Sequence, residues 1–203
     1  MLWVRAWDFA SDEQFGADWT VGTLMGYDLT EEVNTRKVYI ANVVRGQWSP
    51  ETVEEVLLKT AKQDGSHVEI LLEQEPGSAG KIVVDQFKRK LLRGYYVTIE
   101  RPTGPKHIRA NLFYAAAERG EIILVRGPWN KTLLDELEDF PSGDHDDQVD
   151  TCAYGYNRLC GPRPLGPSWS SRTSRVENVA ELQSNEIVTG ATWGQRLGGR
   201  INV

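Results

Sequence analysis

Two predicted strands carry carboxylates that could do chemistry together. Asp8 lies inside an otherwise apolar stretch, and a buried carboxylate there needs a compensating partner. An arginine or a helix cap would serve as that partner, and so would a cation. Glu73 ends a short apolar run, and in open α/β sheets ligands gather at the carboxyl ends of parallel strands. We take Glu73 as the candidate residue and Glu75, two positions later, as an accessory one.

A third group of acids opens the last predicted helix. Four aspartates fall within the seven positions 144–150. One aspartate at a helix N-terminus is favoured by the helix dipole, but four exceed what capping needs and repel one another unless a cation intervenes. Asp146 and Asp147 lie about one helical turn from Asp150, so their carboxylates can converge. The candidates are Asp146 and Asp147, with His145 and Asp150 as accessory residues.

This set of ligands favours hard divalent cations. Carboxylate oxygens are the ligands of Mg²⁺ and Mn²⁺, whereas a zinc site would favour cysteines or paired histidines. Two ions about 4 Å apart would activate a water and stabilise the leaving oxygen of a phosphodiester. The pattern therefore predicts metal-dependent phosphodiester hydrolysis with two bound ions. A generic calcium-binding protein is a weaker alternative, because the sequence has no loop like that of an EF-hand.

Three basic residues are candidates for contact with DNA phosphates. Lys81 follows a run of small residues, 77–80, but the spacing is too short for a nucleotide-binding P-loop and Ile82 replaces the required Ser or Thr. Lys81 at a helix start could still meet a phosphate, and a simple strand-to-helix turn is the alternative. Lys106 and Arg109 open a later helix and form the best basic patch, with a solvated helix face as the alternative.

Periodicity predicts an α/β fold. The expected strands cover 2–10, 18–27, 36–45, 67–73, 95–100 and 122–125, and the expected helices cover 50–64, 81–93, 106–119, 130–139 and 144–159. Three antiparallel strands followed by alternating helices and strands imply a mixed β-sheet flanked by helices. We expect one domain over residues 1–160 and a largely irregular C-terminal tail over 161–203, which is rich in Gly, Ser, Pro and Arg.

Charge and composition add constraints. The net charge is −6, and the tail holds five Arg and three Glu, so residues 1–160 carry 18 basic and 26 acidic groups. A nucleic-acid enzyme with this balance needs cations or a basic partner. No apolar run could span a bilayer and no signal peptide is evident, so a cytoplasmic protein without a membrane partner is expected. Cys152 and Cys160 are expected to be reduced packing residues.

Three segments make the sequence resemble a known family. They are "ILLEQEPGSAGK", "KHIRANLFYAAAERGEIILV" and "FPSGDHDDQVDTCAYGY". Together they resemble the nuclease half of tailed-bacteriophage terminase large subunits, in the ribonuclease H-like superfamily, and the likeness covers roughly residues 3–160. The resemblance implies an endonuclease that cuts concatemeric double-stranded phage DNA during genome packaging, with Mg²⁺ or Mn²⁺. By position it implies the catalytic triad Asp8, Glu73 and Asp147, with Asp146 as an accessory ligand.

The resemblance also implies partners. These are an N-terminal ATPase domain, the portal, to which the variable C-terminus of the family docks, and the small terminase subunit, all in the host cytoplasm. We expect the chain to be a piece of a longer protein, since it holds no ATPase motor. Two alternatives stay open: a resolvase-like nuclease that prefers branched DNA, and a non-catalytic module that links a packaging motor to DNA or portal.

Overall fold

The computed structural model describes residues 1–10, 18–29, 37–75, 77–101, 104–161 and 187–188. Its centre is a mixed sheet with the strand order β5-β4-β1-β2-β3-β6-β7. The strands are β1 (Leu2–Asp8), β2 (Thr20–Tyr27), β3 (Val38–Gly46), β4 (Glu69–Glu73), β5 (Val97–Glu100), β6 (Ile122–Val125) and β7 (Ile187–Val188). The first three pair in antiparallel fashion, and β4, β5 and β6 add in parallel, which confirms the predicted mixed sheet.

The register of the sheet brings two strand ends together. β1 pairs with β4 in parallel, with Trp7 opposite Leu72, so Asp8 and Glu73 end neighbouring strands at the same edge. β1 is central, and all its residues from Leu2 to Trp7 are buried. A strand covered on both faces is expected to be almost wholly apolar. Asp8 is therefore the last residue of β1, directly after its buried part.

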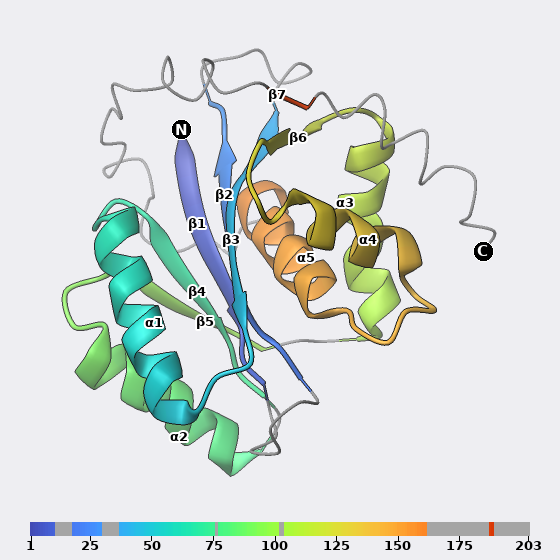
Figure 1. Ribbon diagram of the computed structural model, residues 1–203. Helices are drawn as coiled ribbons and strands as arrows, with labels where there is room; N and C mark the ends of the chain where they lie inside the picture. The colour runs from blue at the N-terminus through green and yellow to red at the C-terminus, as the bar shows by residue number, and fades with distance from the viewer. Residues whose placement is uncertain (11–17, 30–36, 76, 102–103, 162–186, 189–203) are drawn as a thin grey trace.

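Helices cover both faces of the sheet (Figure 1). α1 (Pro50–Asp64) and α2 (Ser78–Gln86) lie on one face, and α2 continues into a short π-helix, η1 (Phe87–Leu91). α3 (Lys106–Glu118), α4 (Asn130–Asp139) and α5 (Asp147–Cys160) lie on the other. No described helix is long and apolar enough to cross a membrane.

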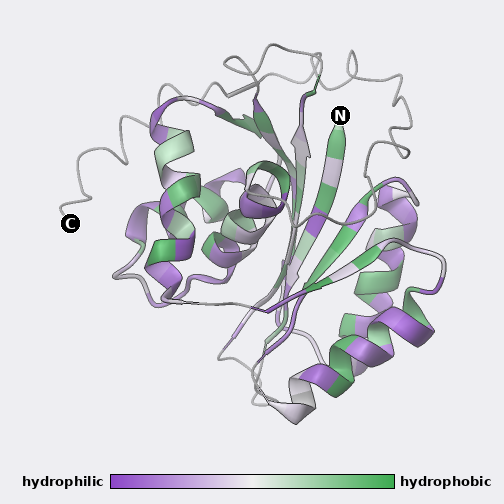
Figure 2. Cartoon of the chain, turned by 180° about the vertical axis from the view of Figure 1, so that it is seen from behind, coloured by the Kyte–Doolittle hydropathy of each residue, from purple (hydrophilic) through white to green (hydrophobic). Residues whose placement is uncertain are grey.

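Each face has its own apolar core. Phe113, Leu133 and Val149 pack with β1, β2 and β6 under α3, α4 and α5. Leu57 and Phe87 pack with Trp7 and Leu72 under α1 and the α2–η1 segment. Seen from behind, the green apolar stripes of the helices turn toward the sheet (Figure 2). Both cores place rigid elements directly beside the strand ends that carry the acids.

α5 packs unusually close to the sheet. Gly155 faces Met25, and a Cβ added there would lie 2.5 Å from the Met25 sulfur. The hydroxyls of Thr23 and Thr151 are 2.7 Å apart, which ties β2 to α5. Because glycine and this buried hydrogen bond fix the spacing, the first turns of α5 are held near the end of β1.

Several boundaries differ from the sequence-based expectations. The last helix begins at Asp147 rather than at 144, and the second helix begins at Ser78 and changes to π geometry at Phe87. Neither Cys152 nor Cys160 forms a disulfide, but Cys160 is exposed and so is not a packing residue. In the predicted tail, the described part is β7, which pairs antiparallel with β6. The division at residue 160 stays a prediction.

Candidate active site

Carboxylates from three elements meet at the edge of the sheet. Burial raises the pKa of Asp8 well above its ordinary value, and the nearby charges of Glu73, Asp150 and Asp147 raise it further. Ionised groups that disfavour one another in this way must lie close together away from bulk water. The structure thus brings together the end of β1, the end of β4 and the first turns of α5, as the spacing of the acids suggested.

Glu73 faces this cluster and Glu75 does not. The pKa of Glu73 is raised by burial, although the Tyr154 hydroxyl donates a hydrogen bond to it. Its Oε2 atom is buried and has no hydrogen-bond partner among the described residues. The pKa of Glu75 is raised by partial burial and then by Asp18, so Glu75 has a different acidic neighbour. The geometry favours Glu73 as the carboxylate of the shared site.

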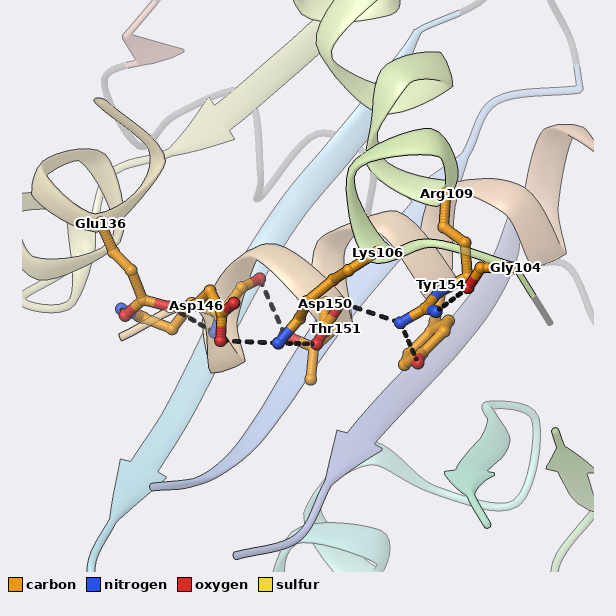
Figure 3. Close-up of polar contacts among 9 residues, drawn as sticks. Gly104, Lys106, Arg109, Glu136, Asp146, Asp150, Thr151 and Tyr154 are labelled. Atoms are coloured by element: carbon orange, nitrogen blue, oxygen red, sulfur yellow. Dashed lines mark hydrogen bonds and ion pairs between the residues drawn. The ribbon is translucent and has the colours of Figure 1, made fainter. Parts of the chain in front are cut away.

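Asp150 is the most deeply buried acid at the start of α5. Its side chain bridges two cations from α3: Lys106 Nζ is 2.5 Å from Asp150 Oδ2, and Arg109 Nη2 is 3.4 Å from Asp150 Oδ1 (Figure 3). Lys106 also pairs with Asp146 at 2.6 Å, and Arg109 donates to the Tyr154 hydroxyl at 3.1 Å. A continuous chain of polar contacts therefore runs across the site.

The basic patch predicted on α3 points into the acids rather than away from them. Burial disfavours the Lys106 ammonium, but its hydrogen bonds to Asp146 and Asp150 outweigh burial and raise its pKa. Arg109 is largely buried in the same cluster. Lys81, in contrast, is exposed on α2, on the other face of the sheet. Lys106 and Arg109 are thus beside the candidate catalytic residues, whereas Lys81 is separate from them.

The other predicted site residues, Asp147, Asp146 and His145, lie at or just before the start of α5. Burial raises the pKa of Asp147 to about 6, and the charges of Glu136 and Asp146 add to the rise. Asp146 is half exposed and pairs with Lys106. His145 packs edge-on against Trp19, with 6.3 Å between ring centroids. Asp147 therefore belongs to the acidic cluster, while His145 supports the loop that precedes α5.

The donor set of this site fits a hard divalent cation. Within the described part of the chain, no three Asp, Glu, His or Cys side chains already form a metal-binding group. The Lys106 ammonium lies between Asp146 and Asp150 and offsets their charge. The unpartnered Glu73 Oε2 and the mutually repelling carboxylates of Asp8 and Asp147 are the features that a cation would satisfy.

Glu136 is a functional candidate that the sequence did not reveal. It lies on α4, is only 7% exposed, and accepts hydrogen bonds from the Gln148 backbone N–H at 2.6 Å and from the Gln148 amide at 2.5 Å. Arg45 approaches it at 3.6 Å and stacks on Trp19, 3.8 Å from the ring centroid. Since α5 has no side-chain cap of its own, Glu136 supplies an acceptor at its N-terminus. The available signal was a charge beside Leu133 and Leu137 on an apolar helix face.

Replacing Glu136 with alanine is expected to destabilise the fold. The change leaves the buried Gln148 backbone N–H without this acceptor and leaves the Gln148 amide with only the Thr132 carbonyl, which costs about 2 kcal/mol and lowers Tm by about 4–8 °C. Thermal unfolding followed by circular dichroism measures this. Asp135→Ala on the same helix removes only an exposed ion pair with Lys131 and serves as the control. Equal melting temperatures for the two variants would contradict the capping role.

Comparison with known proteins identifies a family and solved structures of similar fold. A family model described as the terminase RNaseH-like domain matches residues 5–159. The large terminase nuclease of thermophilic phage G20c with bound zinc is 21% identical, covers 78% of this chain and 81% of its own, and has a TM-score of 0.54. The same nuclease with bound magnesium is 19% identical, covers 77% of this chain and 81% of its own, and has a TM-score of 0.51. The nuclease domain of the large terminase of bacteriophage SPP1 with bound manganese is 14% identical, covers 77% of this chain and 85% of its own, and has a TM-score of 0.45.

No match to a curated protein was found. At these identities the G20c structures support the fold alone, and they confirm the expected ribonuclease H-like mixed sheet with flanking helices. The family model spans well over half of the residues. The chain therefore belongs to the family of terminase RNaseH-like domains.

Proposed function

We propose that this chain is a divalent-metal-dependent endonuclease that cuts double-stranded, concatemeric phage DNA during genome packaging. The observation that carries the proposal is the convergence of Asp8, Glu73, Asp147 and Asp150, whose pKa values are all raised by burial. Such a cluster is costly unless positive charge enters it, and a phosphodiester nuclease needs such charge at the site of reaction. Membership in the terminase RNaseH-like family supports the same activity.

Each residue has a proposed role. Asp8, Glu73 and Asp147 are the catalytic residues and would hold Mg²⁺ or Mn²⁺, with Asp146 as a further ligand. When bound, two such ions supply an activated water and neutralise charge on the leaving oxygen. Asp150 pairs with Lys106 and Arg109, and these two cations would neutralise a DNA phosphate. Tyr154 orients Glu73 through its hydroxyl.

The substrate and the partners follow from the family. We propose double-stranded DNA as substrate with little sequence preference, because no described element is suited to reading base edges. In the full-length protein the partners would be an N-terminal ATPase domain, the portal and the small terminase subunit, in the cytoplasm of the host. The G20c nuclease binds zinc in one structure and magnesium in another, which supports a divalent cation here as well.

Cleavage of a supercoiled plasmid by the purified chain tests the proposal. With Mn²⁺ or Mg²⁺ we expect nicked and linear products, and with EDTA we expect none, because the carboxylates alone cannot activate water. Parallel reactions on a linear duplex and on a four-way junction test the resolvase-like alternative. A folded protein that leaves plasmid, duplex and junction intact with both metals would contradict the proposal and favour a docking module.

A further inference from the structure

One segment of this acidic domain is strongly basic. Residues 78–93 hold five basic side chains and a single acid, Asp85, although residues 1–160 as a whole hold 18 basic and 26 acidic groups. We call four of the five the basic strip: Lys88, Arg89, Lys90 and Arg93. All four are exposed. The basic strip lies on the α1–α2 face of the sheet, away from the cations of the candidate active site (Figure 1).

The π-helix is what turns the basic strip outward. Phe87 and Leu92 are both buried, although they are five residues apart. The Leu92 N–H donates to the Phe87 carbonyl at 2.8 Å, which is the bond pattern of a π turn. In a regular α-helix, residues five apart face different directions, but the wider turn places both in the core. Of the residues between them, Lys88, Arg89 and Lys90 are exposed, while Leu91 packs against the core.

The basic strip contributes little to the stability of the fold. Arg89 is 79% exposed, and its ion pair with Asp85 is long, at 3.9 Å. An exposed pair of this kind contributes little to stability. Holding four like charges on a short segment costs repulsion, so the arrangement is not explained by folding. It is explained if a polyanion binds there.

Position along the chain connects the basic strip to the active site. α2 begins at Ser78, just after Glu73 ends β4, and then leads to η1. Lys81 stands near the start of this path and Arg93 at its end, roughly 18 Å farther at the helical rise. This length matches about five base pairs of a duplex. The segment thus carries one cation, Lys81, near its start and the four cations of the basic strip at its far end.

We propose that the basic strip binds the phosphate backbone of double-stranded DNA outside the site of cleavage. This inference rests on the proposed function. The occupant is DNA rather than an acidic protein surface, because a duplex is a regular line of charge that the rest of this domain repels. Binding would be independent of sequence, since the contacts are to phosphates.

The test is DNA binding by the full chain with all four residues changed to glutamine. Fluorescence anisotropy with a random duplex of about 30 base pairs, in Ca²⁺ and over a range of salt, gives the dissociation constant and its salt dependence. We expect affinity to fall at least about tenfold and the slope of log affinity against log salt to fall by about 3, since up to four phosphate contacts are lost. In Mn²⁺, the KM for plasmid cleavage should rise while the rate at saturating DNA stays unchanged.

A charge-matched control separates local contact from net charge. It neutralises four exposed cations elsewhere, namely Lys59, Lys62, Arg119 and Lys131. We expect this variant to keep the wild-type salt slope. Equal loss in both variants, or wild-type binding by the strip variant, would overturn the inference. Because anisotropy does not require cleavage, failure of the nuclease activity would be distinguishable from failure of the basic strip.

Discussion

Replacing Asp8 with asparagine is expected to reduce plasmid cleavage in Mn²⁺ by about a thousandfold or more. Asp8 ends β1, and the charges of Glu73, Asp150 and Asp147 add to the rise of its pKa that burial causes. The amide keeps the shape of the side chain but removes a negative ligand, and metal ions supply several kcal/mol of stabilisation to such a transition state. Initial rates of plasmid nicking at saturating DNA measure the loss.

The stability of this variant provides its control. Since burial and the neighbouring carboxylates raise the folded pKa of Asp8 above its unfolded value, ionisation of Asp8 costs stability. The cost is full above the folded pKa, shrinks as the pH falls below it and vanishes below the unfolded pKa. Asp8→Asn removes that cost at every pH. Its Tm without metal should equal or exceed that of the wild type. A well-folded variant that cuts at the wild-type rate would exclude Asp8 from the chemistry.

Changing Glu73 to glutamine is expected to lower cleavage by about a hundredfold or more, whereas Glu75→Gln should stay within about twofold of the wild type. Only one residue, Gln74, separates these carboxylates in sequence, but their surroundings differ. Glu73 receives the Tyr154 hydroxyl and has a buried, unpartnered oxygen, while Glu75 has Asp18 as its acidic neighbour. The comparison of nicking rates decides which glutamate is the ligand.

The pair of variants forms its own matched control. Both remove one negative charge next to the end of β4, so a general change in the electrostatic field would affect them alike. If Glu73 is the ligand, the nicking rates of the two variants must differ. If Glu75→Gln has the larger effect, the ligand has been assigned to the wrong residue. If neither matters, the end of β4 is not part of the site.

The sequence predicted the parts of the site that depend on local patterns. The sequence predicts Glu73 at the end of a strand and Asp8 inside the strand 2–10. In the structure β1 ends at Asp8, and its parallel pairing with β4 places both carboxylates at neighbouring strand ends. The mixed sheet follows from the order of strands and helices in the same way. Alternation and periodicity are local properties of the sequence. They predict the strands and helices because the buried face of each element must be apolar.

Tertiary contacts determined what the sequence could not predict. Lys106 and Arg109 are predicted from sequence to contact DNA phosphates, with a solvated helix face as the alternative. Their orientation into the acidic cluster depends on Asp150, which lies 44 and 41 positions away. The start of α5 at Asp147 depends on an acceptor from α4, Glu136. The π turn at Phe87 arises because the core accepts Phe87 and Leu92 together. None of these contacts leaves a signal within a short window of sequence.

The most direct test of the central claim is an anomalous difference map from crystals of the chain soaked in Mn²⁺. The account predicts a manganese peak among the carboxylates of Asp8, Glu73 and Asp147, at the edge where β1 and β4 end. It also predicts that the Lys106 ammonium no longer bridges Asp146 and Asp150 wherever a cation has taken up their charge. A map with strong manganese peaks elsewhere and none among these three carboxylates would contradict it.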